Sequence, residues 1–465
     1  MPRRIPTTFD VIVIGGGSAG IAAADVARQN GARVCMIEAD RLGGECPNWA
    51  CVPTKAMLRA AMLYDEIRHA APEAGIRTGD VQFHFGRLMA RKDAVVDAVT
   101  GHGKRLAAWA KANDIEVVRG DAAFADPHAI RVGTMKLRAR AFVIATGSVD
   151  AIPPIAGIED VDYATSRDVV SLKTLPDRIA VIGGGPVGME FATFFSLLRR
   201  KVTLIEAGKA VLPREDAEVA ALAAAALRGH GAAVYEHAKV LAVRRKGKTT
   251  EITFQRGTKR RETLRADLLL VATGKRPNVA HLGLDVAGVR RDDRGRLVLN
   301  RNLQTSVPHI YAAGDVTSGY LFTHTAHAEG AFVGALAAGA PAPRTTKPLL
   351  PVVPRVTFVV PEVASVGMTE AAARKAGKKV AVARFPIGAL SRAVIDDTRD
   401  GLVKVVMETR TGKILGAHII GSRAGECIHE LALAIHAGIP FDEVAAMLHA
   451  FPTYSEGIAA AAGSL

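Results

Sequence analysis

Hydrophobic positions near the N-terminus follow a strand pattern first and a helical pattern next. The β-branched run Phe9–Ile14 has the character of a strand buried on both faces. It is followed by the glycine-rich segment 15–20, an alanine-rich amphipathic helix to about Asn30, and an apolar run at 32–37 that ends at Glu38. This order predicts a strand, a tight turn, a helix, a second strand and an acid, which is the pattern of a dinucleotide-binding unit.

The same pattern returns later in the chain. Arg178–Ile182 predicts a buried strand, segment 183–188 is a second G-x-G-x-x-G, and Met189–Arg199 predicts a helix. Lys201–Ile205 then predicts a strand that ends at Glu206. Two such units imply two bound dinucleotides, the alternative being that one unit is a duplicate that no longer binds.

The glycines of both segments allow a tight turn and close approach of the backbone to a pyrophosphate. Glu206 favours NADH, because a carboxylate accepts a hydrogen bond from a ribose 2′-hydroxyl and repels a 2′-phosphate; Lys209 nearby leaves NADPH possible. Three further strands end in small residues or in Gly-Asp, where a nucleotide could meet the backbone or where the chain simply turns. The candidate dinucleotide-binding residues are Gly15, Gly17, Ser18, Ala19, Gly20, Glu38, Ala145, Thr146, Gly147, Gly314 and Asp315, with Gly183, Gly185, Val187, Gly188, Glu206 and Gly274 in the second unit.

Between these units lies a pair of cysteines at a spacing typical of redox chemistry. Cys46 and Cys51 follow a Gly-Gly loop, and prolines at 47 and 53 would distort the first turn of a helix enough to bring the two sulfurs together. A helix N-terminus and a cation such as Lys55 would lower a thiol pKa. The alternatives are half of a zinc site and two inert buried thiols; zinc ordinarily needs a second ligand pair at short spacing. We therefore expect a redox pair and no resident metal.

The C-terminal third predicts a different kind of domain. Five prolines in segment 341–354 indicate a linker, after which strands at 355–360, 401–408 and 413–421 and helices at 425–437 and 441–449 predict an α+β domain. The predicted fold is α/β, with two Rossmann-like dinucleotide-binding domains and a C-terminal α+β domain. The predicted domain boundaries are 1–150, 151–277, 278–345 and 346–465.

Composition and charge argue against a secreted, a membrane-spanning or a nucleic-acid-binding protein. Hydrophobic residues at 49% and charged residues at 23% of 465 residues are ordinary for a globular protein. Four cysteines argue for a reducing compartment, and we expect a cytoplasmic protein without a targeting or membrane-spanning segment. The net charge of +14 is scattered along the chain, so no nucleic-acid partner is expected.

Taken together, these motifs resemble the class I flavoprotein disulfide reductases from Phe9 to Glu456. The resemblance implies that the first glycine motif and Gly314-Asp315 bind FAD, that the second glycine motif binds the nicotinamide nucleotide, and that the C-terminal domain forms a homodimer. It implies further that Gly44 and Lys55 lie at the flavin. Cys51 would be the flavin-side thiolate, Cys46 the thiol that meets the substrate, and Glu190 the ion-pair partner of Lys55.

The sequence departs from that family near its end. Members that reduce disulfides carry a His-Pro-Thr segment, whose histidine pairs with a following glutamate and protonates the leaving thiol. Here Phe451 precedes the proline, so the imidazole is missing and Glu456 lacks its usual partner. His449 lies two residues earlier and is a candidate substitute, provided that it reaches the sulfur. Mercuric reductases and their relatives also lack this histidine.

These observations lead to three functional hypotheses. In the first, NADH or NADPH reduces a small electrophile or a soft metal ion, with Hg²⁺ as the best example, through FAD and the Cys46–Cys51 pair. In the second, the chain is a dihydrolipoamide dehydrogenase in which His449 or water supplies the proton. In the third, it is a non-catalytic flavoprotein that binds a partner. Cys35 and Cys427 are expected to be buried and inert.

Overall fold

The computed structural model describes residues 6–258, 260–341 and 352–464, and these form two compact units. The first unit comprises Met1–Pro53, Ala90–Ala151 and Lys275–Leu350, and the second comprises Thr54–Met89, Ile152–Gly274 and Pro351–Leu465. Both combine helices with sheets, which confirms the predicted α/β class. Most of the predicted linker at 341–354 lies outside the described residues.

The first unit is built on a mixed seven-stranded sheet with the order β3-β2-β1-β6-β5-β4, in which β16 also pairs with β6. β1, β2, β3, β16 and the C-terminal half of β6 run parallel, whereas β4, β5 and the start of β6 form an antiparallel meander. The carboxyl ends of the parallel strands therefore share one edge. The strands are β1 (Thr8–Ile14), β2 (Val34–Glu38), β3 (Glu116–Arg119), β4 (Ala122–Asp126), β5 (Ala129–Val132), β6 (Met135–Ile144) and β16 (Ile310–Ala312), with a separate pair β7 (Ser148–Asp150) and β15 (Lys275–Pro277).

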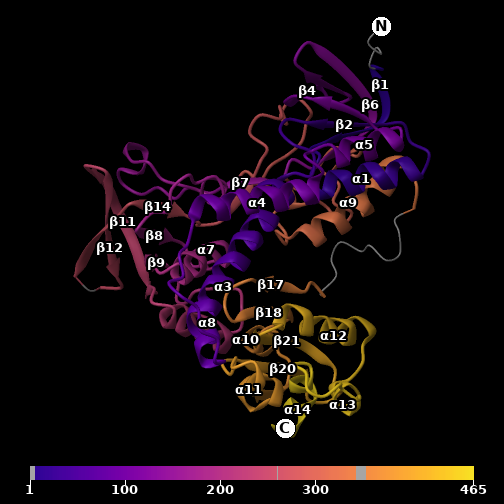
Figure 1. Ribbon diagram of the computed structural model, residues 1–465. Helices are drawn as coiled ribbons and strands as arrows, with labels where there is room; N and C mark the ends of the chain where they lie inside the picture. Colours follow the sequence, from indigo (N-terminus) through magenta and orange to yellow (C-terminus); the bar gives the residue numbers. More distant parts are fainter. Residues whose placement is uncertain (1–5, 259, 342–351, 465) are drawn as a thin grey trace. The chain divides into compact units, whose positions relative to one another are not determined.

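Helices α1 (Ser18–Gln29) and α9 (Thr323–Ala338) lie side by side against this sheet (Figure 1). Two glycines of α9 make the close packing possible. A Cβ at Gly330 would stand 2.1 Å from the carbonyl oxygen of Ala19, and one at Gly334 would stand 2.5 Å from that of Ala23. This unit also contains α2 (Glu45–Trp49), α5 (Arg105–Ala112) and the 3₁₀ turn η2 (Asp315–Thr317). Helices α3 (Cys51–Glu73) and α4 (Phe85–Thr100) have residues in both units.

The second unit contains the repeat of the nucleotide-binding pattern. A parallel sheet of order β10-β9-β8-β14 adjoins a three-stranded antiparallel sheet β11-β12-β13. Its elements are η1 (Ile158–Asp160), α6 (Ser166–Val169), β8 (Arg178–Ile182), α7 (Pro186–Leu197), β9 (Lys201–Ile205), α8 (Ala217–Gly229), β10 (Ala233–Tyr235), β11 (Ala238–Lys246), β12 (Thr249–Arg256), β13 (Arg261–Ala266) and β14 (Leu268–Val271). The predicted strands at 178–182 and 201–205 match β8 and β9, while the helix begins at Pro186, three residues before the predicted start.

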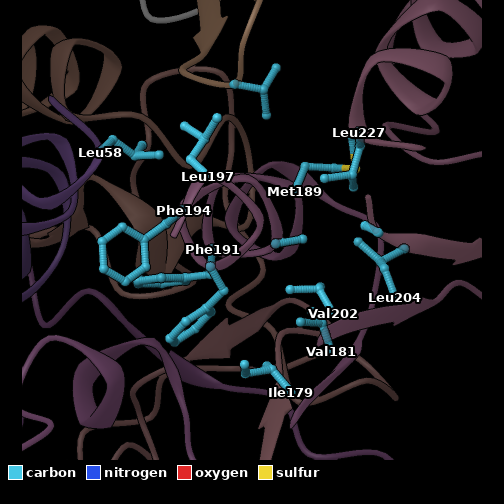
Figure 2. Close-up of a cluster of buried hydrophobic side chains, with 14 of the residues drawn as sticks. Leu58, Ile179, Val181, Met189, Phe191, Phe194, Leu197, Val202, Leu204 and Leu227 are labelled. Carbon is cyan, nitrogen blue, oxygen red and sulfur yellow. The ribbon is translucent and has the colours of Figure 1, made fainter. Parts of the chain in front are cut away.

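Helix α7 is apolar on nearly all sides, because it is buried between the parallel sheet and its neighbours. Phe191 and Phe194 point into a cluster with Leu58 of α3, while Met189 of α7 lies near Leu227 of α8 (Figure 2). Full burial of a phenylalanine contributes roughly 1.5–3 kcal/mol relative to exposure. This core fixes the start of α7, where the second glycine motif lies.

The C-terminal part of the second unit is an antiparallel sheet of order β17-β18-β21-β20-β19 covered by short helices. The sequence predicted three of its strands but not β18 and β19, and the first strand is shorter than predicted. Its elements are β17 (Arg355–Thr357), β18 (Glu362–Gly367), α10 (Glu370–Lys375), β19 (Val380–Pro386), η3 (Ile387–Ala389), α11 (Ser391–Ile395), β20 (Leu402–Glu408), β21 (Ile414–Gly421), α12 (Ala424–Ala437), α13 (Phe441–Ala446), α14 (Glu456–Ala460) and η4 (Ala461–Ser464).

A buried cation joins this antiparallel sheet to α8. Lys404 of β20 is 2% exposed, and its ammonium lies 2.9 Å from Asp216 and 2.6 Å from Glu218, at the start of α8, and 2.9 Å from Glu370. Hydrogen bonds from Arg384 and Lys404 lower the pKa of Glu218 to about 2. These three carboxylates offset part of the cost of burying the charge, and removing one of them would leave Lys404 less well paired. No helix in the described ranges has the length and apolar character needed to cross a membrane.

Candidate active site

The two cysteines lie in consecutive helices, whereas the sequence predicted a single distorted helix. Cys46 is the second residue of α2; Ala50 then leaves the helical region with φ −126° and ψ −93°, and α3 begins at Cys51. Because Cys51 is the first residue of a 23-residue helix, its sulfur lies at the positive end of the helix dipole, which favours a thiolate.

The loop before the cysteines is held against the first glycine motif. The N–H of Gly43 donates to the carbonyl of Gly16 at 2.8 Å, and a Cβ at Gly44 would stand 2.8 Å from the Cα of Gly17. Gly44 also has φ +65°, so both the close approach to Gly17 and the backbone conformation require glycine here. The contact places the cysteine segment beside the predicted pyrophosphate site.

Asn48, which no motif in the sequence marked, fixes the same loop from inside. Its side chain is buried, and its amide donates to the carbonyls of Gly44 at 2.9 Å and Leu42 at 3.2 Å. A buried amide has to find such partners, since an unsatisfied one costs about 1–3 kcal/mol. An asparagine between the two cysteines was the signal available in the sequence.

The residues of both glycine motifs fit a dinucleotide. Gly17 and Gly185 are the N-caps of α1 and α7, and neither helix start is capped by a side chain. A Cβ at Gly185 would meet no heavy atom within 4 Å, and the nearest atom to one at Gly17 would be 3.7 Å away. Uncapped helix N–H groups with open space above them are suited to a pyrophosphate. Ser18, Ala19 and Gly20 form the first turn of α1, and Val187 and Gly188 lie in that of α7.

Two glutamates hold the glycine motifs in the same way. Glu38 accepts from the N–H of Gly16 at 2.7 Å, and Glu206 accepts from the N–H of Gly184 at 2.6 Å. Each carboxylate therefore stands at the glycine turn, at the end of the second strand of its unit, as the motif predicts. Their hydrogen bonds to a ribose remain a prediction.

The remaining candidate residues of the first unit surround the end of β16. Ser148 donates to the carboxylate of Asp315 at 2.7 Å, and burial raises the pKa of that carboxyl. The Thr146 hydroxyl donates to the carbonyl of Asn278 at 2.7 Å, which ties the 145–147 turn to the segment after β15. Gly147 and Gly314 have φ of +70° and +81°. Gly274, which belongs to the second unit, has φ +111°.

Glu329 of α9 is a buried carboxyl next to the Gly314-Asp315 motif, and no sequence motif marked it. Its carboxylate accepts from the N–H of Gly314 at 2.7 Å. Burial raises its pKa from 4.5 to about 7; the hydrogen bonds from Gly314 and Thr317 lower it, and the charge of Asp315 raises it. In the sequence, the one indication of this carboxyl was a glutamate among the small residues of α9.

This carboxyl should make stability depend on pH. An acid with a raised folded-state pKa binds its proton more tightly in the folded than in the unfolded chain, so its contribution to stability falls as pH rises from 4.5 to about 7. The loss should be about 3 kcal/mol, and Glu329→Gln should lack it. Chemical unfolding of the flavin-loaded protein at pH 5 and pH 8 measures the difference. Parallel pH profiles of wild type and Glu329→Gln would contradict the assignment.

In the second unit, Lys55 and Glu190 form the predicted ion pair. The ammonium of Lys55 lies 2.7 Å from Glu190 and 4.7 Å from the ring centroid of Phe358. Glu190 is 5% exposed and also accepts from the N–H of Phe358 at 3.0 Å. These three contacts fix the direction of the lysine head group. Phe358, which lies beyond the predicted linker, is a supporting residue that the sequence did not reveal.

The segment 447–456 does not assemble an acid–base pair within the second unit. The His449 side chain is only 6% exposed; its Nε2 bonds Glu430 of α12 at 2.9 Å, and its Nδ1 bonds the carbonyl of Met447 at 3.0 Å. Both ring nitrogens are therefore engaged. Glu456 accepts from the N–H of Thr453 at 2.8 Å, and Phe451 is 74% exposed.

The other two cysteines are buried. Burial raises the pKa of Cys35 to about 12, and it also raises the pKa of Cys427. Thiols of this kind are poor nucleophiles. Of the described cysteines, Cys46 and Cys51 therefore remain the candidates for redox chemistry.

Family models, curated relatives and a solved structure all place the chain among flavoprotein oxidoreductases of one family. Residues 9–330 match the pyridine nucleotide-disulphide oxidoreductase family, and residues 353–462 match the dimerisation domain of the same family. A mercuric reductase of Staphylococcus aureus is 34% identical over 98% of this chain and 82% of its own, and a dihydrolipoyl dehydrogenase of Thermus scotoductus is 37% identical over 98% and 97%. The copper(II) complex of the HOCl-induced flavoprotein disulfide reductase RclA of Escherichia coli is similar in structure, with a TM-score of 0.85 and 28% identity over 97% of this chain and 98% of that one.

Proposed function

Because the chain belongs to the pyridine nucleotide-disulphide oxidoreductase family, we propose that it uses reduced nicotinamide to reduce a soft metal ion or a small electrophile at Cys46 and Cys51. The chain is an NAD(P)H-dependent flavoprotein oxidoreductase, as its relatives are. The proposal concerns its acceptor. Hg²⁺ is the best single example, and the copper(II) complex of RclA makes Cu²⁺ a second metal to test.

The proposed roles of the residues follow from the two cofactors, FAD and the nicotinamide nucleotide. FAD, when bound, carries two electrons between the nicotinamide and the cysteine sulfurs. The glycine turns and the starts of α1 and α7 hold the two pyrophosphates, and Glu206 makes NADH the preferred nucleotide. The ion pair with Glu190 orients Lys55. Cys51, at the start of α3, is the sulfur that remains a thiolate after reduction, and Cys46 meets the acceptor.

One observation supports a metal or electrophile over a disulfide as the acceptor. The position before Pro452 holds Phe451, and both nitrogens of the nearby His449 are engaged by Glu430 and Met447. Reduction of a disulfide releases a thiol that needs a proton, and loss of the proton donor lowers the rate by roughly 10²–10⁴. A metal ion held by two thiolates is reduced without a leaving thiol, so it does not need this imidazole.

The test is a comparison of acceptors at fixed NADH. Steady-state turnover is measured with Hg²⁺, Cu²⁺ and lipoamide, each relative to ferricyanide, a one-electron oxidant that needs no thiol. We expect a metal ion to be reduced at least about 10² times faster than lipoamide. The 37% identity to a dihydrolipoyl dehydrogenase makes that activity the second candidate, and rapid lipoamide reduction with slow metal reduction would establish it instead.

We also propose that the working form is a cytoplasmic homodimer. The residues that match the dimerisation domain carry large apolar side chains in water: Leu448 is 96% exposed and Leu433 is 63% exposed. Exposed leucines of this extent are typical of a surface that a second subunit covers. Light scattering should give twice the chain mass of 49.0 kDa, and a mass of one chain would contradict the proposal.

A further inference from the structure

The sulfur of Cys51 has a hydroxyl neighbour from a distant part of the chain. Its Sγ lies 3.8 Å from Oγ1 of Thr323, which is 272 positions away in sequence and within the same compact unit. This distance is within hydrogen-bond range for sulfur. Within the described ranges, Cys51 is the one recorded partner of the Thr323 hydroxyl.

The contact lies where two helices begin. Cys51 is the first residue of α3, and Thr323 is the first residue of the 16-residue α9. The partial positive charges of both helix N-termini are therefore directed toward this sulfur, and each favours the thiolate over the thiol.

The Thr323 hydroxyl is not needed for capping or for packing. No side chain caps the start of α9, and Thr323 is exposed. The nearby hydroxyl of Thr325 is engaged elsewhere, since it donates to the carbonyl of Phe322 at 2.8 Å. When Cys51 is a thiolate it can only accept, so the hydroxyl must donate to it. A hydrogen bond to a charged group is stronger than one between neutral groups.

We propose that Thr323 is a positioning residue that stabilises the reduced state of the cysteine pair through Cys51. In the reduction, the Cys46–Cys51 bond takes up two electrons from the nicotinamide and one proton; the S–S bond breaks, Cys46 becomes a thiol and Cys51 a thiolate. The hydroxyl of Thr323 bonds only the product thiolate strongly, so it favours reduction. The inference rests on the proposed redox role of the pair, but not on which acceptor is used.

The experiment measures the thiol–disulfide equilibrium of the flavin-loaded protein directly. Wild type, Thr323→Val, Thr323→Ser and the matched control Thr325→Val are equilibrated in glutathione buffers of graded ratio. The two forms of the pair are then quantified by alkylation and mass spectrometry. We expect Thr323→Val to disfavour reduction about tenfold, a shift of about 30 mV toward more negative potential. Thr323→Ser should restore the wild-type value, and Thr325→Val should leave it unchanged.

Two outcomes would overturn the inference and can be told apart from failure of the proposed function. A wild-type potential in Thr323→Val, or an equal shift in Thr323→Val and Thr323→Ser, would show that the hydroxyl does not act on Cys51. If no buffer forms a Cys46–Cys51 disulfide in wild type, the redox pair itself is wrong, and the inference fails with it.

Discussion

Cys46→Ser and Cys51→Ser are each expected to abolish reduction of the acceptor, by at least about 10³-fold in kcat. A serine oxygen neither forms a bond with the remaining sulfur nor binds a soft metal as a thiolate does, so either replacement breaks the electron path at its last step. Oxidation of NADH by ferricyanide should continue in both variants, because it does not use the sulfurs. The measurement is the ratio of the two activities.

The matched control for these variants is Cys427→Ser. This thiol is buried and lies 3.6 Å from the hydroxyl of Ser455, so a serine there keeps a polar neighbour. Its activity ratio should equal that of wild type. A Cys46→Ser enzyme that retained even a tenth of its metal turnover would show that the acceptor is reduced elsewhere, at the flavin for example.

Phe451→His is expected to raise turnover with lipoamide by on the order of 10². The change supplies an imidazole at the position where disulfide-reducing relatives carry one. Glu456, whose carboxylate now accepts from the N–H of Thr453, is the acid available to orient it. Metal reduction should change little, because it requires no leaving thiol. Steady-state kinetics with both acceptors measure the effect.

Phe451→Tyr keeps the size of the side chain without supplying a base and should leave lipoamide turnover low. Glu456→Gln, combined with Phe451→His, should remove most of the gain. If Phe451→His keeps its dimer mass and metal turnover but shows no gain with lipoamide, the missing imidazole is not what sets acceptor choice.

The sequence predicted the local units well, because each one is specified by neighbouring residues. A buried strand, a glycine turn, a helix and an acid lie within one short segment, and so Glu38 and Glu206 both stand beside their glycine turns. The ion pair of Lys55 with Glu190 followed from the family resemblance, and the structure contains it. In each case, the information lies in a motif of fixed spacing.

The sequence did not predict features that depend on distant contacts. The break at Ala50 was missed because Pro47 and Pro53 are compatible with one distorted helix as well as with two. His449 was a reasonable substitute acid until its partner on α12 was known. Strand β19 ends in a proline, which is tolerated on an edge strand but weakens the strand signal.

The joining of the cysteine loop to the first glycine turn has an evolutionary consequence. Gly44 packs on the backbone of Gly17, and Gly43 bonds Gly16, so a mutation in one loop disturbs the other. Selection on flavin retention therefore constrains the sulfur pair as well, and new acceptors have to be acquired by changes elsewhere. The C-terminal residues around Phe451 are free of that constraint, and a lineage could diversify its chemistry there while inheriting the electron-transfer module unaltered.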